Sequence, residues 1–276
     1  MRVVSKTHIL GFTTLSQEPA MLTRMLVTLI LVCRLTTSTD SFAADDEHPL
    51  STAEQKKLAD KFQQQVADCT ARLTTEPKDV DLYSKRADAY FFLADYPEAV
   101  ADYEKMVELN PKIDAEHWRR GIARFYAGQY PEAAKQFESY HSFDDVDREN
   151  GIWRYFSQFK AHGAEKARAG LLLYKKDDRE PFPSVYKLFS KDMTAEQVLG
   201  RIKDADVSAA EREKQLFYAS LYVGLNEALE GRSESARQHL RVSTANKWGP
   251  VSGYGPNYMW HVGRLHFDLQ IGRAHV

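Results

Sequence analysis

Cysteine is scarce in this sequence, and an excess of charge of one sign is missing. Only two cysteines, Cys33 and Cys69, occur among 276 residues. We expect the apolar stretch around Cys33 to be removed, which would leave Cys69 alone and exclude an internal disulfide. The net charge of −2 and the lack of a basic run argue against nucleic acid as a partner. With 43% hydrophobic and 28% charged residues, the composition is that of a soluble globular protein.

Motifs that mark common catalytic, cofactor and metal sites are missing as well. The chain contains no GxSxG, GxGxxG or GxxxxGK[ST] segment and no HExxH. His261 and His266 stand five residues apart, whereas a spacing of four would place two metal ligands on one helix face. The acidic segment 144–147 lacks the spacing of an EF-hand loop, and we interpret it as a solvated loop. We therefore expect no enzyme, no metal site and no cofactor.

Residues 1–43 are predicted to be a signal peptide. Arg24 precedes the apolar run 25–33, and the small residues Ser41 and Ala43 follow, a pattern typical of an export leader that is cleaved after Ala43. The apolar run is shorter than the roughly 20 residues that a membrane-spanning helix needs. We therefore expect a periplasmic or secreted protein. Residues 1–20 are unlike an ordinary leader, which favours Met21 as the natural start.

A repeat of 34 residues organises the region 80–147. The segment ADYPEA at 94–99 recurs as GQYPEA at 128–133. A fixed period of 34 residues is that of tetratricopeptide repeats (TPR), in which each unit is a pair of helices. Pro97 and Pro131 fall in the first turn of the predicted second helix, where the missing N–H of proline is harmless.

The pattern along the rest of the chain predicts an all-α solenoid of TPR helical hairpins with capping helices. Three capping boxes predict helix starts, at 51–54, 194–197 and 208–211. Loops are predicted at 175–183 and 248–256, which are rich in proline, glycine or charge. The expected parts are an N-terminal capping helix or partial repeat at 44–79, two regular repeats at 80–147, a degenerate third repeat at 148–181, short linking helices at 182–207, and a C-terminal TPR-like repeat with a terminal cap at 208–270. Residues 271–276 match a frame of a common sequencing adapter, and we interpret them as an artefact.

Six side chains are predicted to line a concave peptide-binding groove formed by the first helix of each regular repeat. They occupy offsets 5, 9 and 12 of the two repeats and are Ser84, Asp88, Phe91, Trp118, Ile122 and Phe125. Trp118 is the strongest candidate, because tryptophan is enriched at binding hot spots. An apolar and aromatic groove suits an amphipathic helix or an extended apolar peptide. The alternative is that these aromatic side chains pack against a neighbouring repeat or a capping helix.

Several segments also carry a family resemblance. They are RGIA at 120–123, YAG at 126–128, Trp153 with Tyr155, EQVL at 196–199 and FY at 217–218. With the 34-residue period they resemble the TPR superfamily and, along 80–245, the TPR adaptor lipoproteins of the Gram-negative outer membrane (new lipoprotein I type). That resemblance implies an all-helical homodimer that presents peptidoglycan hydrolases to a periplasmic PDZ-type protease and scaffolds cell-wall enzymes.

The chain departs from that family at its leader. Val32 precedes Cys33, at a position where a lipoprotein signal has a small residue. An outer-membrane lipid anchor is therefore the less favoured interpretation, while peripheral membrane association and a homodimer stay open.

The sequence thus predicts an exported scaffold or adaptor that binds a protein or peptide partner, with a role in cell-envelope or peptidoglycan-enzyme turnover implied by the resemblance. The alternative is a carbohydrate- or peptidoglycan-binding module in which segment 248–256 stacks on sugar rings, with Tyr254 as a contact. An accessory domain of an envelope hydrolase is a further alternative.

Overall fold

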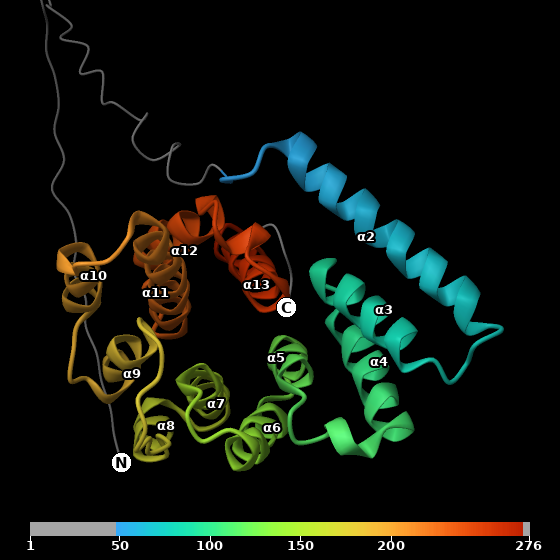
Figure 1. Cartoon of the computed structure of the whole chain (residues 1–276), viewed down its shortest axis with the longest axis horizontal. Coiled ribbons are helices and arrows are strands. Elements are labelled where there is room, and N and C mark those ends of the chain that lie inside the picture. The colour runs from blue at the N-terminus through green and yellow to red at the C-terminus, as the bar shows by residue number, and fades with distance from the viewer. Residues whose placement is uncertain (1–47, 273–276) are drawn as a thin grey trace, which may run out of the picture. The chain divides into compact units, whose positions relative to one another are not determined.

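The computed structural model describes residues 48–272, and these residues are all-helical, with no β-strand among them. The predicted signal peptide, Cys33 and the last four residues of the predicted artefact lie outside the described residues. The described residues belong to one compact unit. Its α-helices, shown in Figure 1, are α2 (Thr52–Leu73), α3 (Val80–Phe92), α4 (Tyr96–Leu109), α5 (Trp118–Tyr126), α6 (Tyr130–Phe143), α7 (Arg148–His162), α8 (Ala164–Ala169), α9 (Phe182–Ser190), α10 (Ala195–Asp204), α11 (Ala209–Leu229), α12 (Ser233–Ala245) and α13 (Tyr254–Gln270).

Helices α3 and α4 form a hairpin whose geometry recurs in α5 and α6. Helix α4 begins at Tyr96 and α6 at Tyr130, so their starts lie 34 residues apart. The turn before each of these helices contains one residue in the left-handed conformation, Ala94 with a φ of 67° and Gly128 with a φ of 76°. A glycine adopts this conformation without strain, whereas alanine pays a steric cost. The sequence repeat is therefore also a repeat of helix boundaries and turn conformation.

Close helix packing in these hairpins depends on small residues. A Cβ atom added to Gly121 of α5 would lie 2.6 Å from Cζ of Phe137 in α6. Sixteen positions separate these two residues, and the same spacing relates Gly224 of α11 to Leu240 of α12, where an added Cβ would lie 2.8 Å from Cγ. The pair α11 and α12 therefore reproduces the close approach seen in α5 and α6.

Local signals in the sequence identified three of the remaining helix starts, those of α2, α10 and α11. The capping boxes at Ser51 and Thr194 are confirmed, with reciprocal bonds to Glu54 and Gln197. At Ser208 the hydroxyl accepts the Glu211 amide, but the reciprocal bond is missing because the Glu211 carboxylate binds Lys214 and Gln215 instead. The second helix of the degenerate repeat, α8, is only six residues long.

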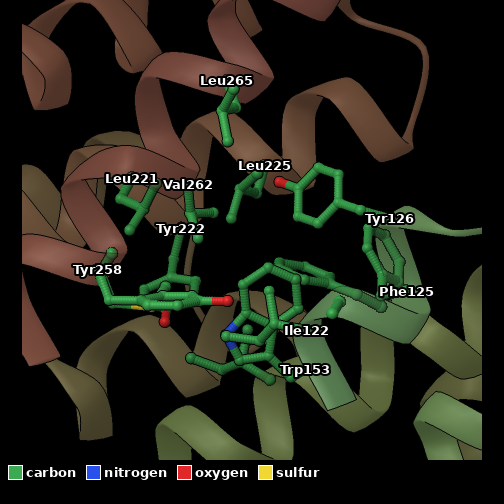
Figure 2. Close-up of a cluster of buried hydrophobic side chains, with 14 of the residues drawn as sticks. Ile122, Phe125, Tyr126, Trp153, Leu221, Tyr222, Leu225, Tyr258, Val262 and Leu265 are labelled. Carbon is green, nitrogen blue, oxygen red and sulfur yellow. The ribbon is translucent and has the colours of Figure 1, made fainter. Parts of the chain in front are cut away.

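Helix α13 departs from the expected terminal cap. It begins at Tyr254, inside the segment predicted to be a loop, and it contacts α3 as well as α11 and α12. Figure 2 shows buried side chains of α13 meeting those of α5, α7 and α11 in one apolar cluster. The labelled members are Ile122, Phe125, Tyr126, Trp153, Leu221, Tyr222, Leu225, Tyr258, Val262 and Leu265. The last helix is therefore part of the core that the repeats share.

A buried polar network also holds α13 against the first repeat. The carboxylate of Asp88 accepts hydrogen bonds from Tyr103 at 2.6 Å, from Arg119 at 2.7 Å and from Tyr254 at 2.5 Å. These partners come from α4, α5 and α13. Farther along α13, the Arg264 guanidinium donates to the carbonyl of Phe92 at 2.5 Å. Asp88 and Tyr103 are buried, whereas Tyr254 is 54% exposed. Loss of the Asp88 carboxylate would therefore leave buried groups unsatisfied.

Candidate functional site

The candidate site is a cavity of about 370 Å³, which we call the aromatic cavity. Helices α5, α6, α7, α11 and α13 all contribute to its wall, and two connecting segments supply Arg179 and Trp248. Its size is that of a small ligand pocket. The lining residues are Trp118, Ile122, Phe137, Tyr140, Asp147, Glu149, Asn150, Trp153, Arg179, Lys214, Tyr218, Trp248, Gly255, Pro256 and Met259.

Local structure fixes two of the tryptophans in this wall. Trp118 is the first residue of α5, and its ring meets that of Tyr258 edge to face at 5.0 Å between centroids. Trp248 is held by Asn246, whose Oδ1 accepts the backbone amide of Trp248 at 2.9 Å. Its ring then packs 5.8 Å from that of Tyr218. Trp118 and Trp248 are therefore positioned by their ring contacts, and Trp248 also by the hydrogen bond from its backbone amide to Asn246.

The start of α7 brings two carboxylates to the cavity. Asp147 is the N-cap residue of α7, and its Oδ1 accepts the amide of Glu149 at 3.0 Å. The Glu149 carboxylate, with 15% of its side chain exposed, accepts a hydrogen bond from the Tyr222 hydroxyl and pairs with Arg179 at 3.1 Å. Arg179 also lies 3.1 Å from Asp178. The Arg179 guanidinium therefore forms ion pairs with both Glu149 and Asp178.

The pKa values of these acids are displaced upward. Burial, reinforced by the charge of Asp147, raises the pKa of Glu149 to about 7. Burial also raises the pKa of Asp147 to about 6, against the opposing effect of Arg179. Groups with displaced pKa values gather at functional sites more often than elsewhere. We call Asp147, Glu149, Asn150 and Arg179 the floor of the cavity. Its two carboxyl groups both have raised pKa values.

The six residues predicted from the repeat do not form an open groove. Ser84 accepts a hydrogen bond from Arg119 at 3.0 Å, and Asp88 lies in the network that binds α13. Phe91 and Ile122 are 0% and 1% exposed, and Phe125 is 7% exposed. The prediction of an open groove is corrected for Phe91 and Phe125, which are buried and do not line the aromatic cavity, whereas Ile122 is buried but lines that cavity.

Helix α13 is the main physical reason for this correction. The ring of Tyr258 stacks on Phe91 at 5.0 Å, and Phe125 packs against Trp153 of α7 at 5.5 Å. The alternative stated for these aromatics, packing against another helix, is the one observed. Trp118 and Ile122 still belong to the cavity wall, since both line it.

Sequence reasoning missed the polar half of the site. It assigned Asp147 to a solvated loop and Arg179 to the charged loop at 175–183, and it gave Glu149 no role. One local signal was available, since Asp147 precedes the first turn of α7 as an N-cap residue does. No local pattern showed that Arg179 would return to this helix, because the two segments lie about 30 residues apart.

Neither a protein-family model nor a curated protein matches the chain. Within residues 48–272, no cluster of three or more histidine, cysteine or acidic side chains is arranged to hold a metal ion. None of the helices in that range combines the length and the apolar character that crossing a membrane requires.

Proposed function

We propose that this chain is an exported tetratricopeptide-repeat scaffold or adaptor that binds a protein or peptide partner in the aromatic cavity. The repeat assignment is supported by the 34-residue spacing between the starts of α4 and α6. It is also supported by the shared close approach of Gly121 to Phe137 and Gly224 to Leu240. Helical repeats of this kind commonly present binding surfaces, because each unit contacts only its neighbours and leaves one face available.

The cavity itself is the observation that carries the binding proposal. Its wall contains Trp118, Trp153 and Trp248, together with two carboxylates and a guanidinium. Aromatic walls with a few convergent polar groups are the usual composition of a ligand pocket. A volume of about 370 Å³ suits one side chain with its adjoining backbone better than a whole folded helix. The proposed mode is therefore insertion of an anchor side chain from the partner.

The cellular setting is proposed from the sequence. The predicted leader supports export, and the resemblance to envelope adaptor lipoproteins supports a role in peptidoglycan-enzyme turnover. On this proposal the chain has no catalytic activity of its own and brings other proteins together.

A peptide selection with a blocked cavity tests the binding proposal. Random peptides displayed on phage are selected on the purified full chain, and their Kd values are measured by fluorescence anisotropy. Gly255 lines the cavity, and a Cβ atom added there would meet no atom within 4 Å, so Gly255→Leu adds bulk at the cavity wall without a clash at its Cβ. Gly200→Leu in α10, where the added Cβ also meets nothing within 4 Å, is the matched control.

The proposal expects selected peptides to bind the unmodified chain and the Gly200→Leu variant alike. Their affinity for Gly255→Leu should be weaker by about tenfold or more, which is about 1.4 kcal/mol. Peptides that bind Gly255→Leu equally well would place the binding surface elsewhere and defeat the proposal.

A carbohydrate-binding function is the second candidate, because Trp248 and Pro256 of the glycine-rich segment line the same cavity. Tyr254, the contact expected for a sugar, donates its hydroxyl to Asp88 at 2.5 Å and is 54% exposed. Binding to isolated peptidoglycan sacculi that Gly255→Leu abolishes would favour this candidate over the peptide scaffold.

A further inference from the structure

At the floor of the aromatic cavity, one guanidinium is shared by several carboxylates. Arg179 faces three carboxylates, those of Asp147 at 3.9 Å, Glu149 at 3.1 Å and Asp178 at 3.1 Å. The other cation in the wall, Lys214, pairs with Glu211 at 3.1 Å. Among the lining residues two acids, Asp147 and Glu149, stand against two cations, while Asp178 and Glu211 pair with those cations without lining the cavity. The side chains of Asp147, Glu149 and Asp178 are at most 22% exposed, so water screens their charges only in part.

The same floor holds one buried acceptor atom that lacks a donor within the described residues. Asn150 is 3% exposed and lines the cavity, and its Oδ1 has no hydrogen-bond partner there. Its Nδ2 is occupied, since it donates to the carbonyl of Phe137 at 2.9 Å. Buried polar atoms are nearly always paired. An unpaired acceptor beside several carboxylates therefore points to a ligand that brings several N–H donors.

Flat aromatic groups surround this floor. Trp118, Trp153, Tyr218 and Trp248 line the cavity from four different segments of the chain. The face of an aromatic ring attracts a cation, and the attraction is strongest for tryptophan and for desolvated sites. A guanidinium both stacks on such faces and presents five N–H donors in a planar fork.

We propose that the aromatic cavity binds the guanidinium of an arginine side chain in the partner peptide. This inference rests on the proposed function and specifies the anchor residue. The ligand guanidinium donates to Asp147 and Glu149 and to Oδ1 of Asn150, while the tryptophans enclose its aliphatic stem. It supplies a second positive charge beside the three carboxylates that share Arg179.

Other anchors fit these groups less well. A lysine ammonium is a compact point charge with strong hydration and no planar face to stack, so it satisfies fewer of the acceptors at once. A carboxylate or phosphate would meet the carboxylates of the floor and be repelled. A purely apolar side chain would leave Oδ1 of Asn150 buried without a donor, which carries a desolvation cost.

Tryptophan indole resonances provide a direct test in the full chain. The probes are N-acetyl-arginine amide and N-acetyl-citrulline amide, which have nearly the same shape but differ in charge. Trp118, Trp153 and Trp248 line the cavity, whereas Trp260 lies outside it and donates to the carbonyl of Thr244 at 2.8 Å. The indole N–H signal of Trp260 therefore serves as an internal reference in a ¹H–¹⁵N titration.

We expect the Kd of the arginine probe, measured from the shifts of the three cavity signals, to be at least about tenfold lower than that of the citrulline probe. The Trp260 signal should not move. Asp147→Asn should remove most of this preference, because it deletes a charge while asparagine caps a helix as well as aspartate does. Equal binding of both probes, no shift with either, or an unchanged preference in Asp147→Asn would overturn the inference.

The selected peptides separate this inference from the proposed function. Peptides that require the cavity but contain no arginine would leave peptide binding intact and refute the arginine anchor. If no selected peptide requires the cavity, the proposed function fails as well.

Discussion

Replacement of Asp88 by alanine should destabilise the protein strongly, because this carboxylate joins α13 to the first repeats. Asp88 is 8% exposed and accepts hydrogen bonds from Tyr103, Arg119 and Tyr254. The variant leaves the Arg119 guanidinium, with 17% of its side chain exposed, without its counter-charge. Breaking a buried ion pair from one side costs roughly 3–5 kcal/mol. For a chain of this size the midpoint of thermal unfolding should fall by roughly 10 °C.

The assay is urea unfolding followed by circular dichroism, with the free energy of unfolding extrapolated to water. Asp60→Ala is the matched control, since it removes an acid from an exposed pair in which Lys56 and Asp60 are 72% and 58% exposed. That control should cost less than about 1 kcal/mol. Tyr254→Phe, which removes one hydrogen bond from the α13 side of the network, should cost about 1 kcal/mol.

A loss of less than about 1 kcal/mol for Asp88→Ala would refute this reasoning. It would mean that the hydrogen bonds of Asp88 do not stabilise the packing of α13 against the first repeats. A loss as large in Asp60→Ala would show that the assay does not distinguish buried pairs from exposed ones.

Two further predictions concern the cavity floor and the packing of the repeats. Glu149→Gln should be more stable than the unmodified chain by up to roughly 3 kcal/mol at pH 8 and nearly equal to it at pH 4. The reason is that the pKa of Glu149 is raised to about 7 in the folded protein. The contribution of Glu149 to stability is therefore fully present below the unfolded pKa of about 4.5 and is lost as the pH rises through 7. Urea unfolding at both pH values measures the difference, and a variant that is less stable than the unmodified chain at pH 8 contradicts the prediction. Gly121→Ala should lower the free energy of unfolding by roughly 1–3 kcal/mol, because its Cβ would lie 2.6 Å from Phe137. Gly200→Ala has open space around its Cβ and should raise the free energy of unfolding by roughly 0.5–1 kcal/mol. Equal shifts of the thermal midpoint in the two variants would contradict the packing argument.

The local part of the fold could be predicted because it is encoded within one repeat. Ala94 and Gly128 mark the same turn, and the helices that follow begin at Tyr96 and Tyr130. A helical hairpin is stabilised by residues within a few tens of positions of each other, so its pattern is visible in the sequence. The capping box at Thr194 is equally local and was predicted for the same reason.

The position of α13 could not be predicted in this way. Asp88 and Tyr254 are separated by 166 positions, yet their side chains are hydrogen-bonded. No period or cap records such a contact. Apolar residues on the first helix of a repeat predict that this face is buried against another surface. They do not indicate whether that surface belongs to a partner or to a later segment of the same chain. Phe91 and Phe125 were therefore assigned to a groove that the structure fills internally.

The candidate site shows the same division between local and distant information. Trp118 was identified from its offset in the repeat, and it does line the cavity. Glu149 and Arg179 were missed, because their meeting depends on how the loop before α9 returns to the start of α7. The raised pKa of Glu149 depends on the start of α7, the loop before α9 and helix α11 together. The sequence of any one of these segments does not reveal it.

Photo-crosslinking in a native extract tests the central claim, which is that a partner inserts into the aromatic cavity. Lys214→p-benzoylphenylalanine places the reactive group in the cavity wall, and Leu173→p-benzoylphenylalanine places it at a side chain that is 86% exposed elsewhere. A protein adduct should form at position 214, and its cross-linked peptide should contain an arginine. Gly255→Leu should remove this adduct. An adduct that forms only at position 173, or that persists at 214 when the cavity is filled, would contradict the account.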